Sequence, residues 1–167
     1  MLYESRDQIP AKYKWTLEDI IPTNEAWEEI FFKCEERIGY FSKYQDKLSD
    51  EDTLFDCLKF TDRLKHDIAS LYKYARMRSD QDTRDSVYQG MVNKAEMLIV
   101  KYSTASSFVI PEISEFSKER LEKLAKSKRF ADYDVFFGEI IRNKNIILSK
   151  KEEKLLGEVG IFSDTNR

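Results

Sequence analysis

The distribution of proline most constrains what this chain can fold into: no proline lies between Pro22 and Pro111. Proline breaks a helix interior because it lacks an N–H group and its ring clashes with the preceding turn. The same stretch is rich in Leu, Glu and Lys, which favour helices, and no sustained alternation of apolar and polar residues suggests a strand. The sequence therefore predicts an all-α fold built from long helices.

Three segments are predicted along the chain. Residues 1–22 form an extended N-terminal segment, since Ile9 and Ile21 each precede a proline, which biases them away from helix. Residues 23–110 form three long helices, and their short connections predict antiparallel neighbours. Residues 111–167 form a subdomain of shorter helices, whose last residues give no sign of a natural domain end.

Capping side chains predict where the long helices begin and end. Thr23 or Asn24 caps the first helix, which is expected to stop around residues 44–47. Residues 49–52 resemble a capping box for the second helix, and several capping side chains at residues 79–82 predict the break before the third.

The third helix is expected to run to Pro111, which ends it. Gly90 falls inside this helix at a cost of roughly 1 kcal/mol relative to Ala, and a close approach of another helix is one hypothesis for its presence. Ser117 is expected to cap a short helix, a further helix runs from about Ala131 to Asn143, and Ser149 begins a capping box.

Apolar residues recur at intervals of three and four in each long helix and predict its buried face. The residues predicted for the core are Trp27, Ile30, Phe31, Cys34, Ile38 and Phe41 in the first helix, Leu54, Cys57, Leu58, Thr61, Leu64, Ile68, Leu71 and Ala75 in the second, and Val87, Met91, Ala95, Leu98, Tyr102, Ala105 and Val109 in the third.

Charge and hydropathy exclude two classes of partner. The net charge is only −3 and no basic block is present, whereas nucleic-acid binding usually needs a concentrated Lys/Arg stripe. No apolar run approaches the roughly 20 residues of a membrane span, and the N-terminus lacks an apolar signal core. Cys34 and Cys57 lie in apolar helical patterns, which predicts reduced core thiols in a cytoplasmic protein and leaves a single disulfide as the alternative.

Catalytic side chains are scarce, and the sequence predicts neither a catalytic nor a metal site. His66 is the only histidine, whereas a zinc peptidase needs at least two histidine ligands and a carboxylate, typically as HExxH on one helix. Cys34 and Cys57 lack the paired short spacings of a structural zinc site. A thiol in an apolar stripe is normally inert, which argues against cysteine catalysis.

One polar cluster surrounds the expected break between the second and third helices. Its candidate binding residues are Tyr74, Arg76, Arg78, Asp80, Arg84 and Tyr88, with Tyr72 and Asp82 nearby. The favoured interpretation is a network of ion pairs and hydrogen bonds that fixes a tight helix corner. The alternative is a peptide-facing surface, since Arg and Tyr are the residue types that anchor peptide backbones and carboxylates.

Three ordered blocks of sequence resemble the oligoendopeptidase F family of zinc peptidases, which is of thimet-oligopeptidase type. They are RDQIPAKYKWTLEDIIPTNEAW at residues 6–27, LYKYARMRSDQDTRDSVYQGMVNKAE at residues 71–96, and, more weakly, IIRNKNIILSKKEEKLL at residues 140–156. The family usually has a histidine just before Leu148, where this chain has Ile147. Together the blocks span nearly the whole chain in the family's order.

The resemblance implies the N-terminal helical lobe of a metalloendopeptidase that encloses oligopeptide substrates. Zinc and its HExxH ligands would belong to a later catalytic domain, so this chain is expected to hold no cofactor and to be inactive alone. Its partners would be the oligopeptide and the missing catalytic domain, and an exposed face between the lobes leaves self-association possible. The alternative function is a free-standing helical module that binds peptides or proteins in a groove.

Overall fold

The computed structural model describes residues 9–10, 13 and 15–144, and the described part of the chain is helical with no strand. The α-helices are α1 (Asn24–Ile38), α2 (Glu51–Gln81), α3 (Ser86–Ser106), α4 (Val109–Ser114), α5 (Lys118–Ala125) and α6 (Asp134–Asn143). The 3-10 turns are η3 (Leu17–Asp19), η4 (Gly39–Lys43) and η5 (Lys128–Tyr133). The predicted all-α fold of three long helices followed by shorter ones is confirmed.

The chain forms two compact units. The first contains Met1–Glu36 and Leu64–Ile99, and the second contains Arg37–Arg63 and Val100–Arg167. Helices α1, α2 and α3 each contribute residues to both units. These units follow packing and not chain order, so the division into residues 1–22, 23–110 and 111–167 stays a prediction.

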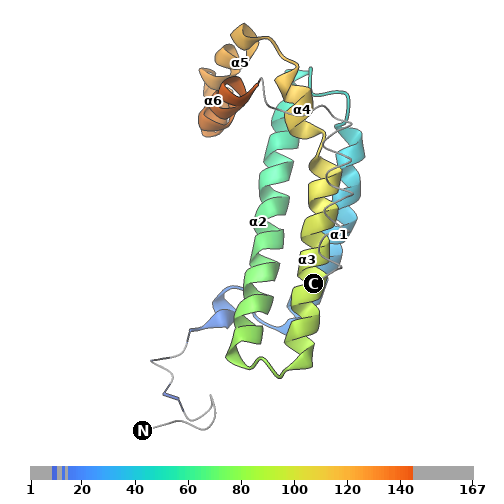
Figure 1. Ribbon diagram of the computed structural model, residues 1–167, viewed down its shortest axis with the longest axis vertical. Helices are drawn as coiled ribbons and strands as arrows, with labels where there is room; N and C mark the ends of the chain where they lie inside the picture. The colour runs from blue at the N-terminus through green and yellow to red at the C-terminus, as the bar shows by residue number, and fades with distance from the viewer. Residues whose placement is uncertain (1–8, 11–12, 14, 145–167) are drawn as a thin grey trace. The chain divides into compact units, whose positions relative to one another are not determined.

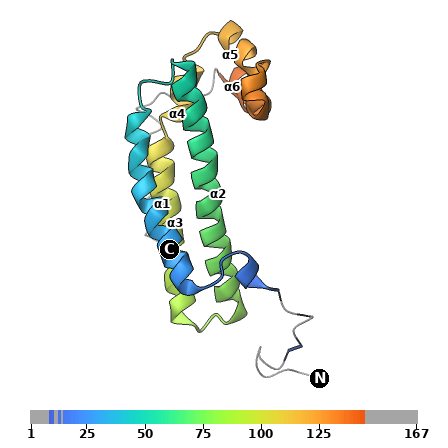
Figure 2. The ribbon, with the colours of Figure 1, turned by 180° about the vertical axis from the view of Figure 1, so that it is seen from behind.

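In the first unit, α1 and α2 run antiparallel. The indole N–H of Trp27 donates to the carbonyl oxygen of Leu71 at 2.9 Å, and the hydroxyl of Tyr74 donates to Asn24 Oδ1 at 3.0 Å. A short turn then returns the chain into α3, which lies beside the other two helices (Figures 1 and 2). The buried core of this unit is Leu17, Ile21, Trp27, Cys34, Leu64, Ile68, Leu71, Tyr74, Ala75, Met91, Val92, Ala95 and Leu98.

Aromatic rings dominate the core of the second unit. The ring of Phe41 makes edge contacts with Phe60, Tyr102 and Phe108, at centroid distances of 5.2, 5.8 and 6.3 Å. Such edge-to-face pairs stabilise a core beyond the area that they bury. The buried residues of this unit include Ile38, Leu48, Leu54, Cys57, Leu58, Val109, Ile113, Phe116, Leu121, Leu124, Phe130, Tyr133, Phe137 and Ile140.

Two caps are where the sequence predicts them. The Thr23 hydroxyl accepts from the N–H of Ala26 at 3.1 Å, and the Ser117 hydroxyl accepts from the N–H of Arg120 at 3.2 Å. The predicted capping box beginning at Ser49 is wrong by one residue. Asp50 caps α2 instead, because its carboxylate accepts from both the N–H and the hydroxyl of Thr53 at 2.8 Å.

The predicted ends of the first and third helices also need correction. The first passes from α1 into η4 at Gly39, so its regular α-helix stops at Ile38, earlier than expected. The third, α3, ends at Ser106, and Pro111 lies inside α4. Pro111 is tolerated there because the first turn of a helix does not use its N–H groups.

The helix predicted over residues 131–143 divides into η5 and α6, with a non-helical backbone at Phe130 (φ −104°, ψ 22°). Val87, predicted for the core of α3, is 59% exposed, so the buried face of that helix begins at Met91. The predicted capping box at Ser149 lies outside the described residues. None of the described helices is both long and apolar enough to cross a membrane.

Candidate functional site

The connection between α2 and α3 is a compact corner of the first unit (Figure 1). Helix α2 continues to Gln81, so the break lies at residues 82–85, slightly later than predicted. Asp85 Oδ1 accepts from the N–H of Val87 at 2.9 Å and caps α3. The side chain of Gln89 donates to the carbonyl oxygen of Thr83 and closes the turn.

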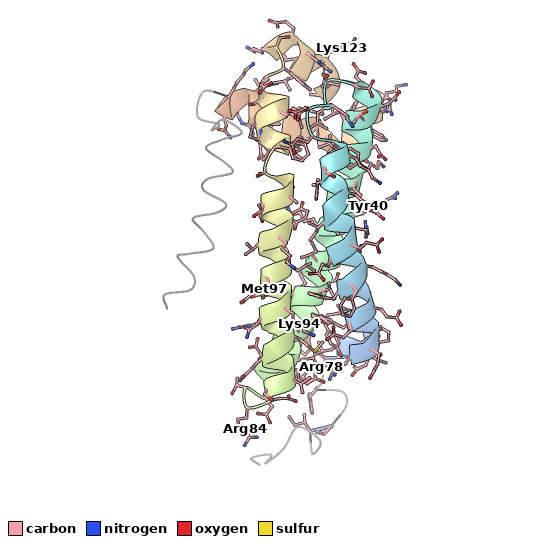
Figure 3. The ribbon with its side chains drawn as sticks, turned by 90° about the vertical axis from the view of Figure 1, so that its right-hand side faces the viewer. Tyr40, Arg78, Arg84, Lys94, Met97 and Lys123 are labelled. Atoms are coloured by element: carbon pink, nitrogen blue, oxygen red, sulfur yellow. The ribbon has the colours of Figure 1, made fainter. Side chains whose placement is uncertain are left out.

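Arg78 is the central residue of this corner. Its guanidinium donates to Glu18 Oε1 at 2.5 Å and lies 5.3 Å from the ring centroid of Tyr74 and 5.9 Å from that of Tyr88. Only 19% of its side chain is exposed. Because Glu18 belongs to η3, Arg78 ties the segment before α1 to the helix corner (its position is labelled in Figure 3).

The pKa of Arg78 reflects its burial and its contacts with Tyr74 and Glu18. Burial by itself lowers the pKa of the guanidinium, but contact with Tyr74 and the Glu18 carboxylate outweighs that effect and raises it. Its Nε atom is buried and has no acceptor among the described residues. Arg78 is therefore a charged group held inside the corner by an ion pair and two aromatic faces.

The six predicted residues do not form one exposed surface. Tyr74 is only 1% exposed, so its ring belongs to the core and is not offered to a ligand. Arg76 pairs with Asp80 one turn along α2 at 3.4 Å, with both side chains more than half exposed.

Arg84 forms a local pair with Asp82 within the turn itself. Its Nε and Nη2 atoms donate to the two carboxylate oxygens at 2.9 and 3.0 Å, and this pairing lowers the pKa of Asp82 to about 2. The geometry therefore supports the favoured interpretation, in which ion pairs and hydrogen bonds around Arg78 fix the corner between α2 and α3. A peptide-binding role for the six residues stays a prediction.

No cluster of described histidine, cysteine, aspartate and glutamate residues could hold a metal ion. The His66 side chain is 82% exposed and its Nδ1 lies 3.7 Å from Asp67 Oδ1. Cys34 and Cys57 are buried, form no disulfide and belong to different units. Burial, with smaller contributions from Glu112 and Asp56, raises the pKa of Cys57 to about 12, which makes its thiol a poor nucleophile.

Sequence reasoning missed a buried carboxylate in the second unit. Glu112, in α4, is 5% exposed, and its two oxygens accept main-chain N–H groups of Asp46 at 2.9 Å and Leu48 at 2.7 Å. Asp46 has a positive φ of 63°, so the chain turns sharply around the carboxylate. A glutamate after a proline near a helix start is common, and no local signal distinguishes this one from a surface residue.

A depression of about 580 Å³ lies beside this carboxylate and is lined by Asp46, Ser49, Glu112, Glu115, Phe116, Ser117 and Arg120. The guanidinium of Arg120 lies 4.0 Å from the ring centroid of Phe116 and donates to the carbonyl oxygen of Ser49 at 2.5 Å. Glu112 and Arg120, two of the polar groups of the depression, therefore both hold the loop before α2. This arrangement is structural support and not a set of catalytic groups.

Comparison with known proteins identifies relatives along most of the chain. A family model described as Oligopeptidase F matches residues 112–166. The chain is 37% identical over 155 residues to Oligopeptidase PepF of Bacillus subtilis, covering 92% of this chain and 23% of that protein. It is 32% identical over 160 residues to the plasmid Oligoendopeptidase F of Lactococcus lactis, covering 94% of this chain and 27% of that protein.

Solved structures show the same fold. The crystal structure of oligoendopeptidase F from Enterococcus faecium matches with a TM-score of 0.75 and 24% identity, covering 86% of this chain and 29% of that one. A putative peptidase from Chlamydophila abortus matches with a TM-score of 0.75 and 18% identity, covering 93% of this chain and 27% of that one. The chain spans about a quarter of the length of the curated relatives it matches.

Proposed function

We propose, from the fact that this chain belongs to the oligoendopeptidase F family and corresponds to the N-terminal region of its members, that it is the substrate-enclosing helical lobe of a zinc metalloendopeptidase. The substrates would be oligopeptides, the class named in the relatives' descriptions. The observation that carries this proposal is the 37% identity to Oligopeptidase PepF along 92% of the chain.

In this proposal the residues of the chain provide shape and not chemistry. Arg78 and Glu18 hold the corner between α2 and α3, and Glu112 holds the loop before α2. In the longer protein, fixed helices of this lobe would restrict access to a cleft by size. The exposed guanidinium groups of Arg76 and Arg84 are the candidates for contact with a peptide backbone or carboxylate.

Zinc does not fit the described part of this chain. The one histidine, His66, is exposed, and no group of three described histidine, cysteine, aspartate or glutamate residues could hold a metal ion, whereas a catalytic zinc site needs three protein ligands. The metal and the water that it activates would belong to the part of the longer protein that the relatives have beyond this match. Cys34 and Cys57 are buried and form no disulfide, which is compatible with a reducing compartment, so the proposed location is the cytoplasm.

The test compares the 167-residue chain with the polypeptide encoded by the complete reading frame. The complete protein is expected to cleave peptides about ten residues long and to lose this activity when a chelator removes the metal. The 167-residue chain alone is expected to cleave nothing. Chelator-sensitive cleavage by the chain alone, or no cleavage by the complete protein with zinc present, would contradict the proposal.

A second measurement addresses the two exposed arginines. Arg76→Ala and Arg84→Ala, each made in the complete protein, are expected to raise KM and leave kcat close to its original value, because they would remove binding contacts distant from the reacting bond. Lys65→Ala, at another exposed position of α2, is the matched control. Unchanged KM in both arginine variants would leave the corner with a structural role alone.

A further inference from the structure

A hollow of about 330 Å³ lies within the second unit, between η4 and the C-terminal end of α3. The buried side chains of Ile38, Phe41 and Phe108 form its floor. Gly39 lines it from the η4 side and Ala105 from the α3 side, and neither has a side chain large enough to fill it. We call this depression the α3 hollow.

Aromatic packing holds the floor of the α3 hollow in place. The ring of Phe41 makes edge contacts with Phe108 and, beneath it, with Phe60, so the floor does not depend on a ligand for its shape. Pockets that bind ligands span about 300–1,000 Å³ and are lined mainly by apolar and aromatic side chains with a few polar groups. The volume of the α3 hollow is at the lower end of this range and suits a single large side chain.

The lining of the α3 hollow, as far as the chain is described, carries no charged residue. Lys101 and Glu35 lie one helical turn from lining residues, and neither of them lines the hollow. Two other hollows differ in this respect. The one beside Glu112 has several charged groups, and the one between α5 and α6 is lined in part by Lys118 and Lys144.

The charged residues adjacent in sequence to the lining residues are directed elsewhere. The guanidinium of Arg37 lies 5.5 Å from the ring centroid of Phe60, and Lys43 Nζ lies 4.0 Å from that of Tyr40, which Figure 3 labels. Asp46 lines the depression beside Glu112 instead. A charged group that entered the α3 hollow would lose its water without gaining an ion pair, so the hollow favours an uncharged, apolar group.

Polar side chains stand at the rim of the α3 hollow, namely Ser42, Gln45, Thr104 and Ser107. The Ser42 hydroxyl donates to the carbonyl oxygen of Gly39, and the Ser107 hydroxyl donates to that of Thr104, each at 2.9 Å. The protons of both hydroxyls are therefore used within their own turns. Each hydroxyl oxygen keeps lone pairs that can accept a hydrogen bond from an N–H group outside the chain.

We propose that the α3 hollow is a subsite for one apolar side chain of an oligopeptide, such as leucine or phenylalanine, whose neighbouring main-chain N–H groups donate to the hydroxyl oxygens of Ser42 and Ser107. This inference rests on the proposed function, in which the ligand is an oligopeptide. The uncharged lining and the volume select the side chain, and the acceptors at the rim select a peptide over a purely apolar molecule.

The first test titrates the 167-residue chain with capped pentapeptides, Ac-Ala-Ala-X-Ala-Ala-NH₂, in which X is Leu, Phe, Asp or Lys. The NMR signals of the Gly39 and Thr104 amides report binding. The Leu and Phe peptides are expected to bind about ten-fold more tightly than the Asp and Lys peptides, because only they bury apolar area without stripping water from a charge. Equal affinity of all the peptides, or unchanged Gly39 and Thr104 signals with the Leu peptide, would overturn the proposal.

The second test fills the α3 hollow from each side. Gly39→Leu has room for the new side chain, since a methyl group added at Gly39 would meet no described atom within 4 Å. Ala105→Leu fills the hollow from α3 with another good helix former. Each variant is expected to weaken binding of the Leu peptide by about ten-fold, because the apolar surface is no longer accessible.

Gly90→Leu is the matched control for this test. Gly90 lies in α3 within the first unit, and a methyl group added there would also meet no described atom within 4 Å. The predicted close approach of another helix to Gly90 is therefore wrong for the described residues. Thermal unfolding shows which variants fold. A folded Gly39→Leu or Ala105→Leu chain with unchanged affinity for the Leu peptide, or an equal loss in Gly90→Leu, would reject the subsite.

Other occupants give different results. Gly39 and Thr104 signals that shift as the concentration of the chain alone rises would identify a second copy as the occupant and reject the peptide. The same follows if 3-methylbutanol, which has the branched chain of leucine but no peptide group, binds as tightly as the Leu peptide.

Binding to the 167-residue chain does not depend on peptidase activity. Selective binding of the Leu peptide together with an inactive complete protein would therefore reject the proposed function alone. An active complete protein whose 167-residue region shows no selective binding would reject this inference alone.

Discussion

The carboxylate of Glu112 accepts a hydrogen bond from the main-chain N–H of Leu48 at 2.7 Å, across 64 residues of sequence. Its other oxygen accepts from the N–H of Asp46 at 2.9 Å. A charge at 5% exposure is costly unless its lone pairs are satisfied, and here the loop before α2 supplies the donors.

Glu112→Gln is therefore expected to destabilise the chain by about 1–3 kcal/mol, because the amide keeps one acceptor and turns an NH₂ group towards the other donor. Urea unfolding followed by circular dichroism measures the effect. Glu115→Gln removes the same charge from an exposed position close by and is expected to change stability by less than about 0.5 kcal/mol. Equal effects in the two variants would mean that the loop does not depend on Glu112.

Trp27 is expected to be among the most sensitive positions of the first unit. Its ring is fully buried, stacks on Phe31 at a centroid distance of 5.3 Å and donates to Leu71 O. Trp27→Phe loses both the hydrogen bond and part of the ring, which costs about 1–3 kcal/mol in denaturant unfolding. Trp15 is 78% exposed, so Trp15→Phe is the control and leaves stability unchanged. An unchanged free energy of unfolding in Trp27→Phe would contradict the packing of Trp27 against Phe31 and Leu71.

Arg78→Lys is expected to loosen the helix corner, although the charge is kept. Lysine has no planar group to lie against Tyr74 and Tyr88, and this loss costs about 1–2 kcal/mol. Thermal unfolding gives the change in stability, and hydrogen exchange in residues 15–21 reports whether the segment before α1 is released. Arg84→Lys, in the exposed pair with Asp82, is expected to show neither effect.

Alkaline pH is expected to destabilise the second unit. Burial raises the pKa of Cys57 from an ordinary value of 9.0 to about 12 and that of Tyr102 from 10.0 to about 12. The unfolded chain loses these protons first, so the stabilisation is complete below pH 9 and is lost as pH rises towards 12. Urea unfolding at pH 8 and pH 11 measures the decline, which the double variant Cys57→Ala/Tyr102→Phe should reduce. A decline of the same size in that variant would assign the effect to other groups.

Gly90→Ala is expected to stabilise the 167-residue chain by roughly 1 kcal/mol, since the added methyl meets no described atom within 4 Å and alanine favours the helix. Gly138→Ala, in α6, is the matched comparison. Its methyl would lie 3.7 Å from Arg142 Nη1, an ordinary contact, and should give a similar gain. Destabilisation by Gly90→Ala alone would reveal a close neighbour of Gly90 in the 167-residue chain.

Local features of the fold were predictable from the sequence. The caps Thr23 and Ser117 act within one helical turn, the spacing of Trp27 and Cys34 covers about two turns of one helix, and the absence of proline from residues 23–110 is read directly from the sequence. Such signals depend on the geometry of a single helix, so they can be recognised in one sequence. The prediction of the cap of α2 was one residue off, because Ser49 and Asp50 are adjacent and both have side chains that can cap a helix. Only the hydrogen bond from Thr53 to Asp50 in the structure decides between them.

Tertiary structure alone decided what the polar side chains do. The sequence brings Tyr74, Arg78 and Tyr88 near one corner, but the partner of Arg78, Glu18, lies 60 residues away. The burial of Glu112 follows in the same way from donors 64 and 66 residues distant. Charge type and spacing do not specify which long-range partner satisfies a group, because that choice depends on how whole helices pack. The sequence by itself determined that the fold is all-helical and which side of each long helix is mostly buried, whereas the packing determined the helix ends, the exposure of Val87 and which charged groups support the fold.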